Sequence, residues 1–302
     1  MLRSPFGVDS ISLKPEEYRL LRDLFSARTG IYFGPEARFS LERRLRERLA
    51  VLNLATFAEY YQHLRFHPNA PAEWDEAIDV LTTNETYFFR EDYQLRSFRD
   101  ELLPALAASA KTRKRLSVWS AGCSTGEEVY TIAIILHESG LFEGWDVRVY
   151  GSDISKRCVA AARRGVYGSS SFRSMPPEFK RQYFTERHDG YHVSERIRAL
   201  CHFGQMNLVE DEKARVLGRA DAVFCRNVLI YLDSHARRKV IDMFAERLYG
   251  GGVLLLGHSE SLLNVSTAFE LLHLKEDLVY RKPAGQFRDA LNANPGNPGK
   301  SE

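Results

Sequence analysis

Hydrophobic residues repeat at helical spacing through the first third of the chain. Between residues 13 and 110, apolar side chains recur every three or four positions, which predicts helices only. The apolar stripes are Leu21, Leu24 and Phe25; Leu41, Leu45, Leu49 and Leu52; and Trp74, Ala77, Ile78 and Leu81. Pro15 and Pro35 suit first helical turns, and a last helix from about Asp92 is expected to break near Pro104.

From Leu116 onward the pattern changes to short apolar runs separated by helical segments. Strands are predicted at 116–120, 147–152, 200–204, 221–225 and 252–257, and then at 268–274 and 277–282. Helices or long connections separate the first five runs, which favours a parallel sheet. The last two runs are joined too tightly for a crossover helix, so they are expected to form an antiparallel hairpin.

These patterns predict an α/β protein with an all-helical N-terminal domain. The expected divisions are the helical domain at 1–81, a linker and connecting helix at 82–115, the sheet domain at 116–283, a small inserted subdomain at about 166–199, and a disordered tail at 284–302. The insertion is polar and rich in Ser, Arg and Tyr, and the tail is rich in Asn, Pro and Gly.

Composition excludes several classes of protein. A hydrophobic content of 44% supports a substantial core, while a net charge of +2 gives no overall signal for nucleic acid. The four cysteines show no metal-ligand spacing and suit reduced cytosolic thiols, so no metal site is expected. Neither a secretory signal nor an apolar run of about 20 residues is present, which predicts a cytoplasmic protein without membrane insertion.

A glycine-containing loop joins the first predicted strand to the next helix. Gly122 and Gly126 permit a sharp turn, and Glu127 and Glu128 open the helix behind them. Two acids at a helix N-terminus would repel a pyrophosphate but attract a ligand with a cationic amino-acid group. S-adenosylmethionine is such a ligand, whereas NAD and ATP are not. The alternative is that the acids only complement the helix dipole.

Polar residues follow the next strands at the edge where parallel sheets bind ligands. Asp153 ends the second strand and suits a bidentate contact to two ribose hydroxyls. The alternative is that Asp153 or Ser155 caps the next helix. Asn207 follows the third strand, where it suits either an adenine edge or an ordinary turn.

Arg226 and Asn227 follow the fourth apolar strand directly, and Tyr231 lies one helical turn further on. Because such polar groups are costly to bury without partners, we expect them to line a functional cleft. A buried structural Arg–Asn pair is the alternative. The later segment Gly257-His258-Ser259-Glu260-Ser261 lacks the final glycine of a serine hydrolase elbow.

Several motifs together resemble the CheR family of chemotaxis receptor glutamate methyltransferases. They occur in family order across about residues 13–283, and so many co-linear motifs are far more specific than one glycine loop. They are Thr82-Thr83-Asn84-x-Thr86-x-Phe88-Phe89-Arg90, Trp119-Ser120-Ala121 with Ser124-Thr125-Gly126-Glu127-Glu128, Ser152-Asp153-Ile154, Phe224-Cys225-Arg226-Asn227-Val228 and Gly257-His258-Ser259-Glu260.

The resemblance implies a class I S-adenosylmethionine-dependent methyltransferase with a Rossmann-like, mostly parallel sheet. Its implied reaction is methyl transfer to glutamate carboxylates of methyl-accepting receptors, giving glutamyl methyl esters for sensory adaptation. It assigns Asn84, Thr86 and Arg90 to the cofactor or transfer site, Glu128 (with Glu127 as a second candidate) to the methionine end, Asp153 to the ribose, Asn207 with Leu208 to the adenine, Arg226 and Asn227 to the cofactor cleft, and Tyr231 to the substrate. Arg90 and Tyr231 are the expected catalytic residues.

The implied partner is the cytoplasmic helical domain of a chemotaxis receptor. We expect it to dock on the basic second helix, with its arginines on or near one face: Arg38, Arg43, Arg44, Arg46 and Arg48. An ordinary solvated helix is the alternative, because Glu42 and Glu47 dilute the charge. Members of the family that tether to a receptor C-terminal pentapeptide have a longer, glycine-containing loop in the stretch that corresponds to residues 183–203, so the resemblance implies no such tether here. We expect a monomer.

Two other functions remain open at this point. One is a class I methyltransferase acting on a different substrate, although a near-neutral chain without a basic aromatic surface disfavours nucleic acid. The other is a catalytically silent module that binds S-adenosylmethionine or S-adenosylhomocysteine for regulation. Such a module would not need substrate-facing residues such as Arg90 and Tyr231.

Overall fold

The N-terminal apolar stripes form four helices around one core. The computed structural model describes residues 11–284 of the chain. The helices are α1 (Pro15–Thr29), α2 (Arg38–Leu52) after a 3-10 turn at Pro35–Ala37, α3 (Phe57–Phe66) and α4 (Ala70–Leu81). Leu21, Leu45 and Trp74 from three of the predicted stripes meet in this core, as the spacing predicted. The expected tail lies outside the described residues apart from Ala284.

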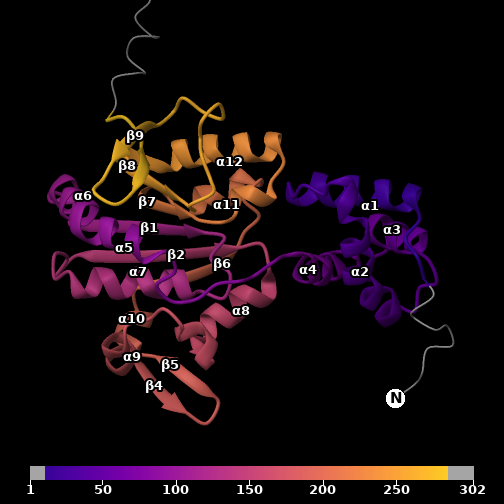
Figure 1. Ribbon diagram of the computed structural model, residues 1–302, viewed down its shortest axis with the longest axis horizontal. Coiled ribbons are helices and arrows are strands. Elements are labelled where there is room, and N and C mark those ends of the chain that lie inside the picture. The colour runs from indigo at the N-terminus through magenta and orange to yellow at the C-terminus, as the bar shows by residue number, and fades with distance from the viewer. Residues whose placement is uncertain (1–10, 285–302) are drawn as a thin grey trace, which may run out of the picture.

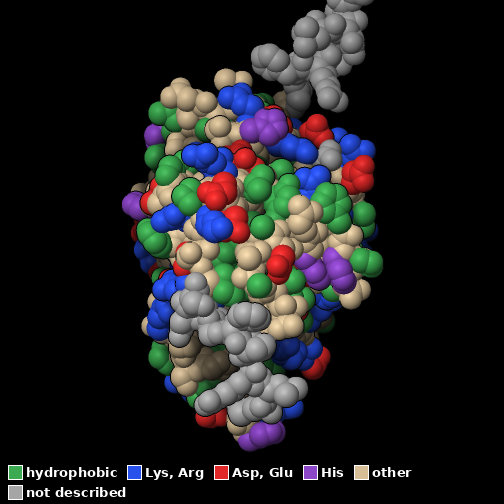
Figure 2. Space-filling model, turned by 90° about the vertical axis from the view of Figure 1, so that its right-hand side faces the viewer, with side chains coloured by type: hydrophobic (Ala, Val, Ile, Leu, Met, Phe, Trp, Pro, Cys, Tyr) green, Lys and Arg blue, Asp and Glu red, His purple; other side chains and the backbone are tan. Residues whose placement is uncertain are grey.

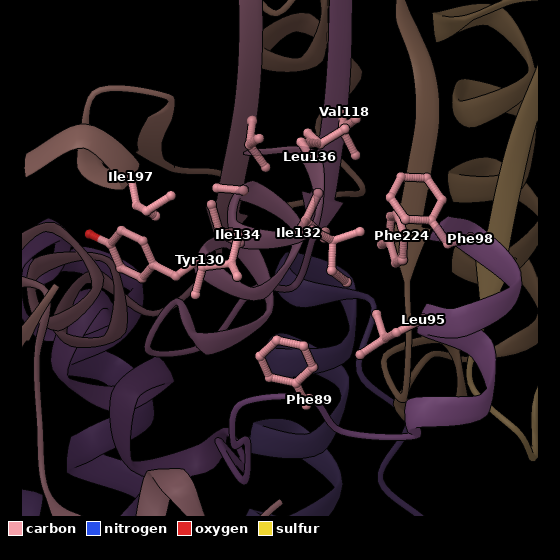
Figure 3. Packing of buried hydrophobic residues seen from close by; sticks show 14 of the residues in the cluster. Phe89, Leu95, Phe98, Val118, Tyr130, Ile132, Ile134, Leu136, Ile197 and Phe224 are labelled. Carbon is pink, nitrogen blue, oxygen red and sulfur yellow. The ribbon is translucent and has the colours of Figure 1, made fainter. Parts of the chain in front are cut away.

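The segment that connects the two parts is helical, and its break lies just before Pro104. It consists of α5 (Asp92–Ser97), a π-helical turn (Phe98–Leu102) and α6 (Leu103–Ala110). Proline lacks an amide hydrogen, so it is tolerated in the first turn of α6 but not in the middle of a continuous helix. Phe98 packs edge-on against Phe224 of the sheet domain with ring centroids 4.9 Å apart, and this pair is visible in Figure 3.

A seven-stranded sheet forms the centre of the larger domain. Its order is β6-β2-β1-β7-β8-β10-β9. The strands are β1 (Arg115–Ala121), β2 (Asp146–Asp153), β6 (Cys201–Gln205), β7 (Ala220–Cys225), β8 (Leu248–Leu256), β9 (Glu270–His273) and β10 (Leu278–Arg281). The first five are parallel and β9 and β10 form an antiparallel hairpin, as predicted; β10 also pairs antiparallel with β8. Strand order reverses between β1 and β7, which is where open sheets bind ligands.

Helices cover both faces of the sheet because alternate strand residues are apolar on both sides. Val118 and Phe224 face the cluster that contains α5, α6 and α7, and Trp119 and Val223 face the cluster that contains α12. The covering helices are α7 (Glu127–Glu138), α8 (Lys156–Arg164), α11 (Asp211–Val216) and α12 (Ser234–Arg247). Figure 1 shows α12 on one side of the sheet and α7 on the other.

The predicted insertion forms a small subdomain below the sheet in Figure 1. It contains β3 (Val166–Tyr167), a 3-10 turn at Ser169–Phe172, α9 (Pro177–Tyr183), β4 (Phe184–Arg187), β5 (Gly190–Val193) and α10 (Glu195–Arg198). Its antiparallel sheet has the order β3-β5-β4. Phe172 stacks on Phe88 of the connecting segment and Phe184 packs edge-on against it, so the subdomain is anchored beside the 84–90 motif.

The helical domain contacts the sheet domain at the end of α1. The amide of Tyr32 donates to the carbonyl of Tyr231 at 2.8 Å, and the amide of Asp233 donates to the carbonyl of Gly30 at 3.0 Å. Asn207 Nδ2 donates to the carbonyl of Arg28 at 2.7 Å. These bonds bring the end of α1 to the carboxyl edge of the sheet, beside the polar residues that follow β6 and β7.

Candidate active site

The loop after β1 lies across the carboxyl ends of β1 and β2. The amides of Gly122 and Cys123 both donate to the carbonyl of Ser152, at 2.8 and 2.9 Å. Gly126 has φ +95, and a Cβ there would lie 2.7 Å from the Cβ of Ala162. Only glycine therefore lets this loop turn into α7 while α8 packs against it.

Asp153 is buried at the end of β2, and its carboxylate is fixed by two backbone amides. Its Oδ2 accepts from the amide of Ser124 at 2.8 Å, and its Oδ1 accepts from the amide of Ser155 at 2.9 Å. Burial raises the pKa of Asp153 against the opposing effect of these bonds. The residue that caps α8 is Ser155, whose Oγ accepts from the amide of Cys158 at 3.0 Å.

The two acids at the start of α7 have different surroundings. Glu128 lines a cavity above the loop, where its Oε1 accepts from Ser120 Oγ at 2.7 Å. Glu127 is buried and is not among the residues that line this cavity within residues 11–284. Its carboxylate accepts from Thr125 Oγ1 at 2.7 Å and from Ser171 Oγ of the insertion at 3.0 Å. Glu128 is therefore the acid that can reach a ligand.

Arg226 is buried between two carboxylates. Its Nη1 lies 3.1 Å from Glu128 Oε2, its Nη2 lies 3.0 Å from Glu91 Oε2, and Nη2 also donates to the carbonyl of Arg90 at 2.6 Å. Burial lowers the pKa of Arg226, but the two acids outweigh it and the pKa is raised. The alternative of an Arg226–Asn227 pair is not found among the described contacts, because Arg226 pairs with acids, and both residues line the cavity as expected.

Asn227 lines the same cavity and has a buried, unpaired side-chain oxygen. Its backbone is left-handed, with φ 58, and its buried Oδ1 has no hydrogen-bond partner among the described residues. Both Asn227 and Glu128 line the cavity. An unpaired amide oxygen near a carboxylate suits a ligand that donates hydrogen bonds and carries a positive charge.

Arg90 lies between two residues with left-handed backbone. Phe89 has φ 58 and Glu91 has φ 56, and neither is glycine. Arg90 Nη1 donates to the carbonyl of Glu85 at 3.0 Å, and its guanidinium lies 5.8 Å from the ring centre of Tyr87. Such backbone strain concentrates at functional sites, and here it presents Arg90 at the cavity wall.

All the predicted site residues line one or both of two adjoining cavities. The first is lined by Thr86, Arg90, Glu128, Arg226, Asn227 and Tyr231, and the second by Asn84, Asp153, Asn207, Leu208 and Tyr231. Gly122 and Tyr231 belong to both. Tyr231 is 42% exposed, so it lies where the cavities meet solvent.

The sequence did not reveal two parts of the site. Thr29 and Ile31, at the end of α1, line the second cavity together with Asn207. No local pattern marks them, because their role depends on how the helical domain docks. Glu91 was also missed, although an acid directly after the Arg90 motif was the available signal.

The residues that line the cavities suit the charge and the polar groups of S-adenosylmethionine. The first offers the carboxylate of Glu128 to a cationic amino-acid group and is also lined by Asn227. The only buried cation near it within residues 11–284, Arg226, is already paired with two acids and cannot hold a phosphate. The second cavity places Asp153 and Asn207 where a nucleoside would lie.

The expectation that the arginines of α2 share one face is wrong. Three are held within the described structure: Arg44 donates to the carbonyl of Leu81, Arg46 pairs with Glu42, and Arg48 pairs with Glu73. Arg38 is half-buried over the ring of Phe39, and Arg43 alone of the five is exposed. Figure 2 shows basic and acidic side chains interspersed at this end of the molecule. Arg43 and Arg46 are three residues apart and Arg44 and Arg48 are four, so each pair shares a side of the helix, but the two pairs and Arg38 lie on different sides.

None of the helices within residues 11–284 has the length and apolar character needed to cross a membrane.

Comparisons with known proteins match both parts of the chain. Residues 84–278 match the family described as CheR methyltransferase, SAM binding domain, and residues 16–82 match the family described as CheR methyltransferase, all-alpha domain. Chemotaxis protein methyltransferase 2 of Vibrio cholerae is 35% identical over 278 residues, which cover 91% of this chain and 96% of that protein.

Two further relatives give the same picture. Chemotaxis protein methyltransferase 2 of Pseudomonas aeruginosa is 36% identical over 86% of this chain and 92% of its own length. The chemotaxis protein methyltransferase of Salmonella typhimurium is 35% identical over 86% of this chain and 89% of its own length. The two family matches include every residue that lines the two cavities except Thr83.

Proposed function

Because the chain belongs to the CheR methyltransferase family, whose cofactor is S-adenosylmethionine, we propose that it methylates glutamate side chains of chemotaxis receptors and that the reaction takes place in its two cavities. The products would be glutamyl methyl esters that serve sensory adaptation. One observation carries the proposal: the acid Glu128 lines a cavity that is also lined by Arg90, Asn227 and Tyr231.

We propose the following division of the cofactor among the two cavities. Glu128 and Asn227 would hold the cationic amino-acid end, Asp153 the ribose, and Asn207 with Leu208 the adenine. Asn84 and Thr86 would contact the cofactor from the connecting segment, and Arg226 would hold Glu128 in place. When bound, S-adenosylmethionine supplies a methyl group on a positively charged sulfur.

The reaction needs alignment more than proton transfer. A glutamate side chain has an ordinary pKa of about 4.3, so it is ionised at neutral pH and needs no general base. Arg90 would orient this carboxylate, and the hydroxyl of Tyr231 would donate a hydrogen bond to one of its oxygens. The other oxygen is then left to attack. Alignment of this kind can lower a barrier by about 7–11 kcal/mol in favourable cases.

Loss of the two substrate-facing groups is expected to reduce turnover. We expect Arg90→Ala to lower kcat/KM by about 100-fold and Tyr231→Phe by about tenfold, the range found for single positioning contacts. The measurement is methyl transfer to the cytoplasmic domain of a receptor. Arg96→Ala, an exposed arginine on the same segment, is the matched control and should keep wild-type turnover.

If both variants retain turnover within a few-fold of the wild type, the assignment of Arg90 and Tyr231 fails. A wild-type protein that binds S-adenosylhomocysteine but transfers no methyl group to receptors would favour the alternative of a silent regulatory module. A wild-type protein that methylates some other substrate instead would favour the alternative of a different class I methyltransferase.

We propose that the receptor still contacts α2, but through Arg43 rather than through a basic face. Arg43 is exposed and has no ion-pair partner within the described chain, whereas Arg46 and Arg48 are paired. Arg43→Glu is expected to weaken receptor binding by about three- to tenfold and to reduce its salt dependence, as for a charge at the rim of an interface. Lys239→Glu on α12 is the control. Unchanged affinity and salt dependence for Arg43→Glu would exclude this site.

We propose that docking needs no tether to the receptor C-terminus. The proposal is supported by the short connection between β4 (Phe184–Arg187) and β5 (Gly190–Val193), whose strands are paired to their ends at Arg187 and Gly190. Removing the last five residues of a receptor is then expected to leave its methylation rate within about twofold. A rate that falls tenfold or more would show that this subdomain does bind the receptor terminus.

We also propose that the protein acts as a monomer in the cytoplasm. Both cavities are lined by residues of one chain, so a second copy is not required to complete the site.

A further inference from the structure

The loop after β8 carries a carboxylate whose function the proposed reaction does not explain. Glu260 accepts hydrogen bonds from four backbone amides: Gly257 at 2.7 Å, Asn227 at 2.8 Å, Val228 at 2.9 Å and Ile230 at 3.2 Å. Backbone amides that converge on one carboxylate form strong, charge-assisted hydrogen bonds. This arrangement joins the loop after β8 to the loop after β7.

Three of the four donors belong to the segment that presents the proposed site residues. Asn227 lines the first cavity and has an unpaired Oδ1, and Tyr231 closes the 3-10 turn that begins at Leu229. The left-handed backbone of Asn227, with φ 58, is less favourable for a residue with a Cβ than the ordinary right-handed one. The bonds to Glu260 hold the segment in this conformation.

Gly257 allows the two loops to approach closely enough for these bonds. A Cβ at Gly257 would lie 2.8 Å from the amide nitrogen of Asn227 and 2.9 Å from both Asn227 Nδ2 and Glu260 Oε2. The intervening His258 and Ser259 are exposed. Gly257 and Glu260 are therefore the two positions of residues 257–260 that are not exposed, and both lie against Asn227.

Glu260 does not line the proposed cofactor site; it lines a separate cavity together with Gly257 and His258. Within residues 11–284 it is not among the residues that line either proposed cofactor cavity, and its carboxylate is engaged by backbone amides. Its influence must pass through the position of Asn227 and of the turn that leads to Tyr231.

We propose that Glu260 is a positioning residue for methyl transfer, which fixes the loop after β7 so that Asn227 and Tyr231 face the reacting groups. This inference rests on the proposed function. A carboxylate is required because all four contacts are donors, and an amide side chain would turn its own N–H groups toward some of them.

The direct test is Glu260→Gln in the full-length protein. We expect kcat for receptor methylation to fall by about 10- to 100-fold, since a displacement of about 1 Å can have an effect of that size. The Kd of S-adenosylhomocysteine should rise several-fold through Asn227. Gly257→Ala, which keeps the carboxylate but displaces Asn227, is expected to cause the same two changes.

Glu270→Gln on β9 is the matched control, because Glu270 only pairs with exposed Arg281. Its kcat and Kd should equal those of the wild type. All variants are compared at a temperature at which circular dichroism shows each of them folded. This condition separates positioning from a simple loss of folded protein.

A double-mutant cycle distinguishes positioning from a general structural effect. If Glu260 acts through Asn227, then adding Glu260→Gln to Asn227→Ala should change the Kd of S-adenosylhomocysteine by less than about twofold. Fully additive effects, or a folded Glu260→Gln protein with wild-type kcat and Kd, would overturn the inference. A wild-type protein without methyltransferase activity would instead overturn the proposed function.

Discussion

Replacing Arg226 by methionine is expected to lower the free energy of unfolding by about 3–5 kcal/mol, because it leaves buried carboxylates without their cation. The side chain of Arg226 is 3% exposed, and those of Glu91 and Glu128 are 17% and 16% exposed. Methionine has a similar volume but cannot donate to either acid or to the carbonyl of Arg90. Denaturant unfolding monitored by circular dichroism gives the measurement.

Arg281→Met is the control for this effect. Arg281 also pairs with a glutamate, Glu270, but both side chains are about half exposed. Exposed pairs contribute about 0–1 kcal/mol, so this variant should unfold almost like the wild type. If Arg226→Met also unfolds within about 1 kcal/mol of the wild type, Arg226 is not the ion-pair centre described above.

Glu128→Gln is expected to weaken binding of S-adenosylhomocysteine by about 100-fold. The cofactor product keeps the amino group that Glu128 would bind, and a hydrogen bond to a charged group contributes about 1.5–3 kcal/mol. That range corresponds to roughly 10- to 150-fold in Kd. Calorimetric titration measures the change, and circular dichroism establishes that the variant is folded, since Arg226 still has Glu91 as a partner.

The neighbouring variant Glu127→Gln supplies the matched control. Glu127 lies outside the cavity, so its change should leave the Kd within about twofold. Burial raises the pKa of Glu127, which penalises the charged form in the folded protein. This penalty on stability is absent below the pKa of Glu127 in the unfolded chain and is complete above its pKa in the folded protein. At neutral pH, Glu127→Gln should therefore be at least as stable as the wild type. Equal loss of affinity in both variants would contradict the assignment of Glu128.

The fold was largely predictable because its signals are local. The apolar runs around Val118 and Phe224 are buried on both faces and read directly as parallel strands. Polar residues that follow such strands, including Asp153 and Asn227, must lie at one edge of the sheet whatever the exact packing. The same reasoning predicted that the cofactor residues lie close together, and they line two adjoining cavities.

The features that the sequence did not predict depend on contacts between distant segments. Arg226 meets acids that lie far away along the chain, at Glu91 and Glu128, and Glu260 meets the backbone near Asn227. The periodicity of one segment contains no information about such partners. The prediction of a basic face on α2 failed for a different reason. The positions of Arg38, Arg43 and Arg44 already place them on different sides of a helix, but the prediction considered mainly the number of arginines.

Methyl transfer from S-adenosylmethionine with a labelled methyl group to a receptor cytoplasmic domain tests the central claim most directly. The account predicts label on receptor glutamates, released as methanol in alkali because a carboxyl ester is hydrolysed there. A receptor with glutamine at the modified positions should remain unlabelled. Failure to transfer the label, or label that is stable in alkali as on nitrogen or sulfur, would contradict the account.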